Sequence, residues 1–302
     1  MKTSYEDIVR TDCIGKSENP ILMNDILKKA ESENLIPSDE QTDKVLFIAV
    51  DVQHDFIEGG SLGVPGASED VRRMTRFIYK NAEKISNIAV SLDTHTPYQV
   101  FHPCWWADAD GNSPEPFTMI TLSDMEQKRW MPRHDEQETK EYLRHLDEMK
   151  MKKLCIWPYH CIQGTIGAAL ENQFANMVYF HSTARNYYIE KLVKGEPRDT
   201  EFYGIIRPEY DPDGRHTNRA FLGRLDTFSK IVIAGEAMDY CVYESIKQIL
   251  AYFPNNEKLH KKLYILEDCT SSIQDRAMAD KMYENIRSKF AINIVRSTDD
   301  FL

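Results

Sequence analysis

Residues 45–56 read VLFIAVDVQHDF, and this stretch decides the fold class. Its first six residues are all apolar and lack the alternation of a strand with one exposed face, which is typical of a strand buried on both faces. Five other short apolar runs resemble it: Ile88–Leu92, Tyr188–Val193, Lys230–Ala234, Leu263–Leu266 and Ala291–Val295. Helical patterns separate most of these runs. This alternation predicts an α/β fold with a mostly parallel central sheet and helices on both faces, in a Rossmann-like three-layer α/β/α arrangement.

The composition excludes several classes of protein. The 302 residues carry a net charge of −11, which argues against binding to nucleic acid or an anionic membrane, because both need a basic surface. The longest apolar run has six residues, whereas a membrane-spanning helix needs about 20. The six cysteines are scattered, without a CxxC pair, as is typical of free thiols in a reducing compartment. We therefore expect a cytoplasmic protein.

Two segments do not fit the alternation of strands and helices. Residues 1–43 are mostly polar, and residues 104–153 begin with the turn-rich CWWADADGNSPEPF. The second segment continues into a charged helix whose apolar side consists of Tyr142, Leu143, Leu146 and Met149. We expect an N-terminal extension at 1–43 and one domain at 44–302 that carries an insertion at 104–153.

Candidate functional residues follow the predicted strands. Asp51 comes directly after the first strand, where a carboxyl group is poorly solvated. Poor solvation raises its pKa and suits proton transfer near neutral pH. The alternative is a residue that only caps the next turn.

A carboxylate and several imidazoles follow the next strands. Asp93 and His95 stand at one strand end, with His102 shortly after them and His160 beyond the insertion. Such side chains can ligate a divalent metal. The alternatives are ordinary loop residues and, for His160, a core-edge histidine bonded to the backbone.

Lys194 and Cys241 complete the set. Lys194 ends a strand, where it can stabilise an anion or serve in catalysis, unless it is a solvated strand-end lysine. Cys241 follows a strand and a turn of small residues, at a predicted helix start. The helix dipole and free N–H groups there lower a thiol pKa and can form an oxyanion hole. The alternative is a buried, inert cysteine.

Five segments together resemble the nicotinamidase branch of the isochorismatase-like cysteine hydrolases. They read DVQHDF…EGGSL, DTH, WPYHCIQGTIG, KG and GEAMDYCV, occur in the family's order, and extend the resemblance over residues 44–103 and 154–298. The resemblance implies the isochorismatase-like fold and a hydrolase of linear, non-peptide amides. The implied reaction converts nicotinamide, or a similar small amide, into the acid and ammonia through a cysteine thioester.

The resemblance also implies catalytic roles. Cys241 would be the nucleophile, Asp51 would take its proton and relay it to the leaving ammonia, and Lys194 would stabilise the thiolate. The backbone N–H groups of Ala237 and Cys241 would hold the oxyanion, with a cis peptide at Glu236–Ala237.

Substrate and metal sites are implied in the same way. Phe56 and Trp157 would sandwich the substrate ring. A divalent metal, for which we expect zinc with iron or manganese as alternatives, would coordinate the pyridine nitrogen. Its implied ligands are Asp93, His95, His102 and His160. Family members often self-associate, so a homo-oligomer is a further expectation.

Two other hypotheses stay open. The insertion at 104–153 and the acidic Glu236 favour a cysteine hydrolase of the same superfamily that acts on a larger amide or a carbamoyl compound. The polar extension and the charged insertion favour a non-catalytic binding protein on this fold. The presence of Asp51, Lys194 and Cys241 argues against the binding protein.

Overall fold

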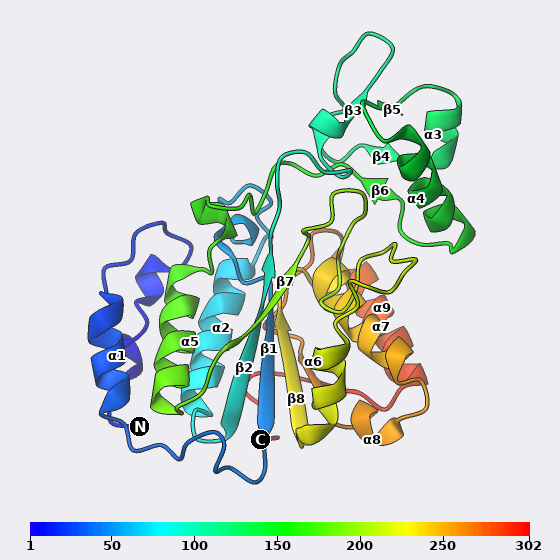
Figure 1. Cartoon of the computed structure of the whole chain (residues 1–302). Coiled ribbons are helices and arrows are strands. Elements are labelled where there is room, and N and C mark those ends of the chain that lie inside the picture. Colours follow the sequence, from blue (N-terminus) through cyan, green and yellow to red (C-terminus); the bar gives the residue numbers. More distant parts are fainter.

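The computed structural model describes residues 1–302. Its centre is a six-stranded sheet with the order β10-β9-β8-β1-β2-β7, in which every neighbouring pair is parallel (Figure 1). The strands are β1 (Val45–Val50), β2 (Ile85–Asp93), β7 (Glu190–Lys194), β8 (Lys230–Gly235), β9 (Leu263–Leu266) and β10 (Asn293–Val295). All six predicted strands are confirmed, and only their ends differ by a few residues.

Helices cover both faces of this sheet, as predicted (Figure 1). One face carries α2 (Ala67–Lys80) and α5 (Asn172–Ala184), and the other carries α7 (Tyr243–Tyr252) and α9 (Arg276–Lys289). The shorter helices α6 (Arg219–Arg224) and α8 (Glu257–His260) lie beside α7. The apolar residues at helical spacing in α2 are buried against the sheet: Val71, Met74, Phe77 and Ile78. No helix has the length and apolarity that crossing a membrane requires.

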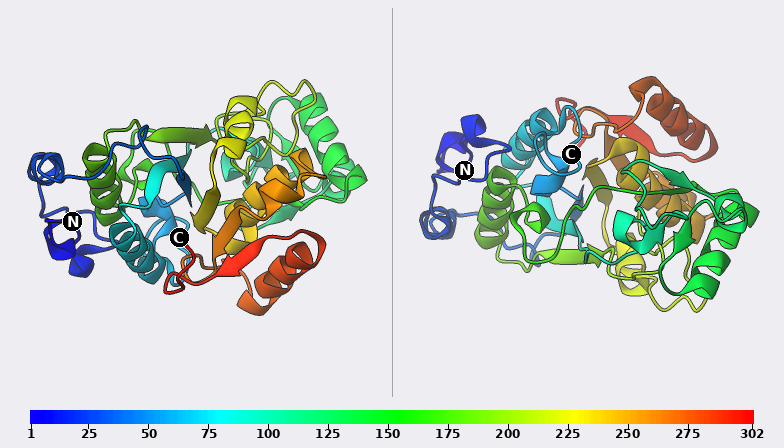
Figure 2. Two further views of the ribbon diagram at one scale, coloured as in Figure 1. Left: turned by 90° about the horizontal axis from the view of Figure 1, so that it is seen from below. Right: turned by 90° about the horizontal axis from the view of Figure 1, so that it is seen from above.

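The N-terminal residues form an outer layer against α5. Their helix α1 (Met23–Glu31) lies along the outside of α5, away from the sheet (Figures 1 and 2). The buried carboxylate of Glu171 joins the two parts, because it accepts hydrogen bonds from the N–H of Phe174, 2.8 Å away, and of Gly15, 3.1 Å away. One acid therefore caps α5 and fixes the extension.

The insertion folds above the carboxyl ends of the sheet strands, on the side of α7 and α9 (Figures 1 and 2). It contains β3 (Trp106–Ala107), β4 (Met119–Ile120), α3 (Leu122–Glu126), β5 (Met131–Pro132) and α4 (Glu136–Glu148). β3 pairs with β5, and β4 pairs with β6 (Leu154–Cys155), which leads back to the core.

The predicted helix of the insertion is α4, with one correction to its apolar side. Tyr142, Leu143 and Leu146 are buried, but Met149 lies beyond the last turn and is 62% exposed. The turn-rich segment before it is better packed than its composition indicates, because Trp105 and Trp106 are fully buried. The buried side chains of the insertion belong to the same hydrophobic core as those of the sheet.

The topology places the candidate site. β1 lies between β2 and β8. The sheet continues from β1 through β2 and β7 on one side and through β8, β9 and β10 on the other, so β1 lies at a topological switch point. Ligands of open α/β sheets bind at such points, beyond the carboxyl ends of the strands. β8 ends at Gly235, which has φ 121° and lies so close to β1 that a Cβ would overlap the carbonyl oxygen of Val50. Only glycine permits this approach of the two strand ends.

The packing of α1 can be tested with one buried and one exposed residue. Ile26→Ala empties a fully buried position of α1 and is expected to lower the free energy of unfolding by about 2–5 kcal/mol. Leu22→Ala, at a position that is 68% exposed, is the control and should change it by less than about 0.5 kcal/mol. Urea denaturation followed by circular dichroism measures both. Equal stability of the two variants would contradict the packing of α1 on α5.

Candidate active site

A buried lysine connects the ends of the central strands with the turn after β8. The Nζ atom of Lys194 lies 2.9 Å from Oδ2 of Asp51, 2.9 Å from Oδ1 of Asp93 and 3.7 Å from Sγ of Cys241. All four residues are buried. The interpretation of Lys194 as a solvated lysine is therefore wrong, and so is that of Asp51 as a simple turn cap.

The charges within this group follow from burial and proximity. Burial opposes the positive charge of Lys194, but Asp51 and Asp93 outweigh it and raise the pKa of the lysine well above its usual value. Burial raises the pKa of Asp51, while Lys194 acts in the opposite direction. The expected upward shift for Asp51 is thus confirmed, and it suits a group that accepts and returns a proton.

Cys241 lies on a π-helical turn, Met238–Val242, that leads from β8 into α7. Burial raises its thiol pKa well above the usual value; Lys194 opposes this shift, and Asp51 and Asp93 add to it. The lowered pKa expected from the helix start is therefore wrong, because desolvation and two neighbouring carboxylates outweigh the helix end. The thiol needs a neighbouring base to lose its proton.

The turn before Cys241 has the predicted cis peptide at Glu236–Ala237. The carbonyl of Ala237 accepts hydrogen bonds from the N–H groups of Tyr240 and Val242, both at 3.1 Å, whereas the N–H of Ala237 itself has no acceptor in the protein. Ala237 and Cys241 line the same cavity. A free N–H group at this place is available to a substrate oxygen.

Glu236 does not place a charge at this cavity. Its side chain is fully buried on the side of α2, where Oε2 accepts from the N–H of Ser271 at 3.3 Å. Asp70 of α2 lies beside it and accepts from the hydroxyl of Ser271 at 2.5 Å. Burial and the nearby Asp70 raise the pKa of Glu236 well above its usual value, which favours the uncharged form of this acid.

Three of the four predicted metal ligands converge. Asp93, His95 and His160 each offer a ligand atom, and these atoms all lie within 4.8 Å of one another. Oδ2 of Asp93 is 3.0 Å from Nε2 of His95 and 3.6 Å from Nε2 of His160. His102 does not belong to this group, although its ring centroid is 5.8 Å from that of His95 and 6.0 Å from that of His160.

The histidines are oriented as metal ligands usually are. In His95, His102 and His160, Nδ1 lies 2.8–3.1 Å from a backbone carbonyl oxygen. A carbonyl accepts, so Nδ1 donates to it, and Nε2 is turned away from the backbone, where it is available to an ion. Nε2 of His102 is buried without any hydrogen-bond partner. One carboxylate and imidazole nitrogens are a donor set that suits a divalent transition metal, so the residues fit such an ion.

A cavity of about 350 Å³ borders both the metal group and Cys241. Phe56 and Trp157 line it together, as expected of residues that contact one substrate, and its other apolar walls are Leu62, Phe202, Tyr203, Tyr240 and Ile273. The space inside it is narrow, which favours a small, flat molecule. Glu201 also lines the cavity and accepts from Nε1 of Trp157 at 2.9 Å.

The sequence did not point to three residues that orient this site. Ser91 donates its hydroxyl to Asp51 at 2.5 Å and accepts from the N–H of the same residue at 2.8 Å. Gln53 accepts from the N–H of Asp93 at 2.7 Å and donates to its carbonyl at 2.8 Å. A serine within a buried strand was the available signal for Ser91, whereas no pattern marks Gln53 or Glu201.

Comparisons with known proteins show what the chain is similar to. No protein-family model matches the chain. A nicotinamidase of Saccharomyces cerevisiae is 24% identical over 250 residues, which are 82% of this chain and 97% of that protein.

Solved structures extend the similarity to the fold. The yeast nicotinamidase bound to the inhibitor nicotinaldehyde has a TM-score of 0.58 at 21% identity, over 83% of this chain and 99% of that chain. An Acinetobacter baumanii nicotinamidase and pyrazinamidase has a TM-score of 0.56 at 19% identity, over 86% of this chain and 99% of that chain. The chain is thus similar in sequence to the yeast nicotinamidase, and it shares the α/β fold of both solved structures.

Proposed function

We propose that this protein is an amidohydrolase that converts nicotinamide, or a similar small aromatic amide, into the carboxylic acid and ammonia. The observation that carries the proposal is the contact of Lys194 with Asp51 and Cys241 beside a small cavity lined by aromatic side chains. The same cavity borders Asp93 and His160 of the metal group. The yeast relative, named a nicotinamidase, supports the choice of substrate.

Cys241 and Asp51 carry out the two halves of the reaction. Asp51 takes the proton of the thiol, and the thiolate attacks the amide carbon. Asp51 then gives the proton to the amide nitrogen, the C–N bond breaks, ammonia leaves and a thioester remains on Cys241. In the second half, Asp51 takes a proton from water as the water oxygen attacks the thioester. The C–S bond breaks, the acid leaves, and the thiolate recovers a proton from Asp51.

Lys194 and the cis-peptide turn stabilise the charges that form. The ammonium of Lys194 lies 3.7 Å from Sγ, so it offsets the negative charge of the thiolate in a site from which water is largely excluded. The N–H groups of Ala237 and Cys241 receive the oxyanion of the tetrahedral intermediate. Hydrogen-bond donors fixed before the reaction are the most effective ones, because they need no reorganisation.

Asp93, His95 and His160 would hold a divalent metal, with His102 as a candidate fourth ligand. We expect zinc, and iron or manganese are the alternatives. When bound, the ion supplies a Lewis acid for the ring nitrogen of the substrate. Phe56 and Trp157 then hold the ring, which places its carboxamide near Cys241.

Both alternative hypotheses fit the site less well. A larger amide or a carbamoyl compound with bulky substituents has little room in this narrow cavity, which the aromatic side chains enclose. A binding protein without catalytic activity does not need a buried lysine between two carboxylates and a thiol, an arrangement that is costly to bury.

The chain organisation and the setting are also proposed. We infer that residues 44–302 form one hydrolase domain, which residues 1–43 extend and residues 104–153 cap. All six cysteines are unpaired, which supports a reducing, cytoplasmic location.

Ammonia release from nicotinamide tests the reaction directly. Removal of the nucleophile in Cys241→Ala is expected to lower kcat by about 10⁴-fold or more. The control is Cys13→Ala, at a partly exposed cysteine in the N-terminal layer, which should keep the wild-type rate. Full activity of Cys241→Ala, or hydrolysis of other amides but not of nicotinamide, would contradict the proposed nucleophile or the proposed substrate, respectively.

The raised pKa of Glu236 gives a second prediction. Because the raised pKa favours the uncharged acid, Glu236→Gln, which introduces a neutral amide of the same size, is expected to keep kcat within about threefold, with little change in stability. Glu236→Ala leaves the N–H of Ser271 unsatisfied and should lower the free energy of unfolding by about 1–3 kcal/mol. Kinetics and thermal unfolding measure the effects. Equal damage by the two substitutions would show that Glu236 acts as an anion.

Metal analysis of the purified protein tests the ligand set. We expect one divalent ion per chain, lost on dialysis against a chelator together with the activity and regained on addition of the ion. His160→Ala should abolish retention of the ion, and His102→Ala should weaken binding by about 10–100-fold. His216→Ala, at an exposed histidine, is the control. Unchanged metal content in His160→Ala would rule out this set of ligands.

A further inference from the structure

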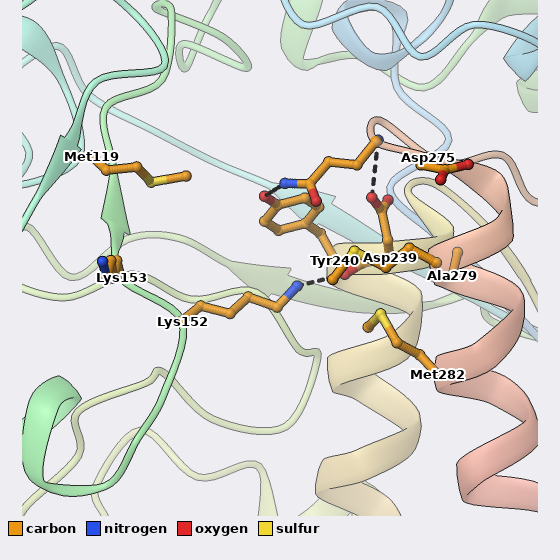
Figure 3. Close-up of a pocket in the computed structure, with 10 residues that line it drawn as sticks. Met119, Lys152, Lys153, Asp239, Tyr240, Asp275, Ala279 and Met282 are labelled. Carbon is orange, nitrogen blue, oxygen red and sulfur yellow. Dashed lines mark hydrogen bonds between the residues drawn. The ribbon is translucent and has the colours of Figure 1, made fainter.

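One lysine of the insertion reaches the turn that carries the nucleophile. Lys152 lies between α4 and β6, and its side chain extends toward Asp239 and Tyr240 (Figure 3). Its Nζ atom donates to the carbonyl oxygen of Asp239 at 2.5 Å and lies 3.8 Å from the ring centroid of Tyr240. Asp239 and Tyr240 directly precede Cys241, so the insertion contacts the turn that carries the proposed nucleophile.

The ammonium of Lys152 has no carboxylate partner. It forms none of the ion pairs of the protein, and the carboxylate of Asp239 already accepts the N–H groups of Ile273 and Gln274, both at 3.0 Å. Burial lowers the pKa of Lys152, while Glu244 and Asp239 oppose this shift. The partners of this partly buried cation are the carbonyl of Asp239, the ring face of Tyr240 and, farther away at 5.9 Å, the ring of Tyr203, and these contacts hold it in place.

Tyr240 separates two spaces. On one side it lines the cavity of about 350 Å³ next to Cys241. On the other it lines a more open hollow of about 870 Å³ between the insertion and α9, whose walls include Met119, Met278 and Met282 (Figure 3). The ring is held between these spaces by Lys152, by the side chain of Gln274, which donates to the hydroxyl at 2.8 Å, and by the edge of Trp157 at 5.3 Å.

We propose that Lys152 is a positioning residue that holds Tyr240 as the wall between the two spaces, and that this wall limits the amide to one ring. The substrate limit rests on the proposed amidase function, whereas the position of the wall does not. Without Lys152, Tyr240 loses the contact with its ring face and can move toward the hollow. The methionines there have flexible side chains and adapt to new contacts, so bulkier molecules gain space.

Three variants separate this role from a general effect on folding. Lys152→Met keeps the length of the side chain but removes the charge, and Lys152→Arg keeps the charge and can stack on Tyr240. Lys153→Met makes the same change as Lys152→Met at the neighbouring exposed lysine and is the matched control. The substrates are nicotinamide and nicotinamide with a phenyl group on its ring.

Lys152→Met is expected to raise KM for nicotinamide about tenfold, equivalent to about 1.4 kcal/mol. It should also raise kcat/KM for the phenyl-substituted amide, relative to nicotinamide, by at least tenfold. Lys152→Arg should stay within about threefold of wild type in both measures, and Lys153→Met should match wild type. A lower melting temperature for Lys152→Met with an unchanged ratio of the two substrates would overturn the proposal.

A second measurement does not depend on amide hydrolysis. The rates at which iodoacetamide and the larger iodoacetanilide alkylate Cys241 are compared by peptide mass spectrometry. Lys152→Met should raise the relative rate of the larger reagent, whereas Lys153→Met should not. If the wild-type protein fails to hydrolyse nicotinamide, only the proposed function fails. If the alkylation ratio is the same in all variants, the wall proposal fails.

Discussion

The position of one ammonium group determines the chemistry of this protein. The buried Nζ atom of Lys194 lies 2.9 Å from a carboxylate oxygen of Asp51 and 2.9 Å from one of Asp93. Without these partners, neither the lysine nor the acids would be stable in their charged forms in such a buried place. Removal of one member leaves an unpaired buried charge. The three strand ends that carry these residues must therefore end at the same level, which a parallel sheet provides.

This arrangement couples proton transfer by Asp51 to the metal group. Asp51 faces the thiol of Cys241, while Asp93 belongs to the metal group with His95 and His160. Lys194 contacts both acids, so the charge of the metal group and the proton affinity of Asp51 depend on each other. The raised pKa of the thiol makes this coupling necessary, because Cys241 becomes a nucleophile only when a base takes its proton.

The added segments act on this centre from outside. The insertion covers the carboxyl ends of the strands, and Lys152 connects it with the turn of Cys241. The N-terminal layer packs on α5 at the far side, and none of its residues lines the cavity. The two segments interrupt the strand–helix alternation equally, yet only one of them lies where it can influence the choice of substrate.

The sequence predicted the parts of the structure that depend on local patterns. Six apolar runs marked the strands, and a parallel sheet then required Asp51, Asp93 and Lys194 to meet at one edge. The direction of the thiol pKa was not predictable, because the depth of burial of Cys241 depends on several distant segments.

Contacts between distant segments set the other limits of the prediction. Glu236 looked like a charge at the site, but its burial and the nearby Asp70, which is far away in the chain, raise its pKa and favour the uncharged acid. Ser91 and Gln53 orient the carboxylates through contacts that no spacing reveals.

The central claim is that Cys241 forms a covalent thioester with the acyl group of the substrate. Mass spectrometry of protein quenched with acid during turnover of nicotinamide tests this claim most directly. The peptide that contains Cys241 should gain the mass of one nicotinoyl group, and the gain should disappear when the substrate is exhausted. Turnover at the full rate without any adduct on this peptide would contradict the account.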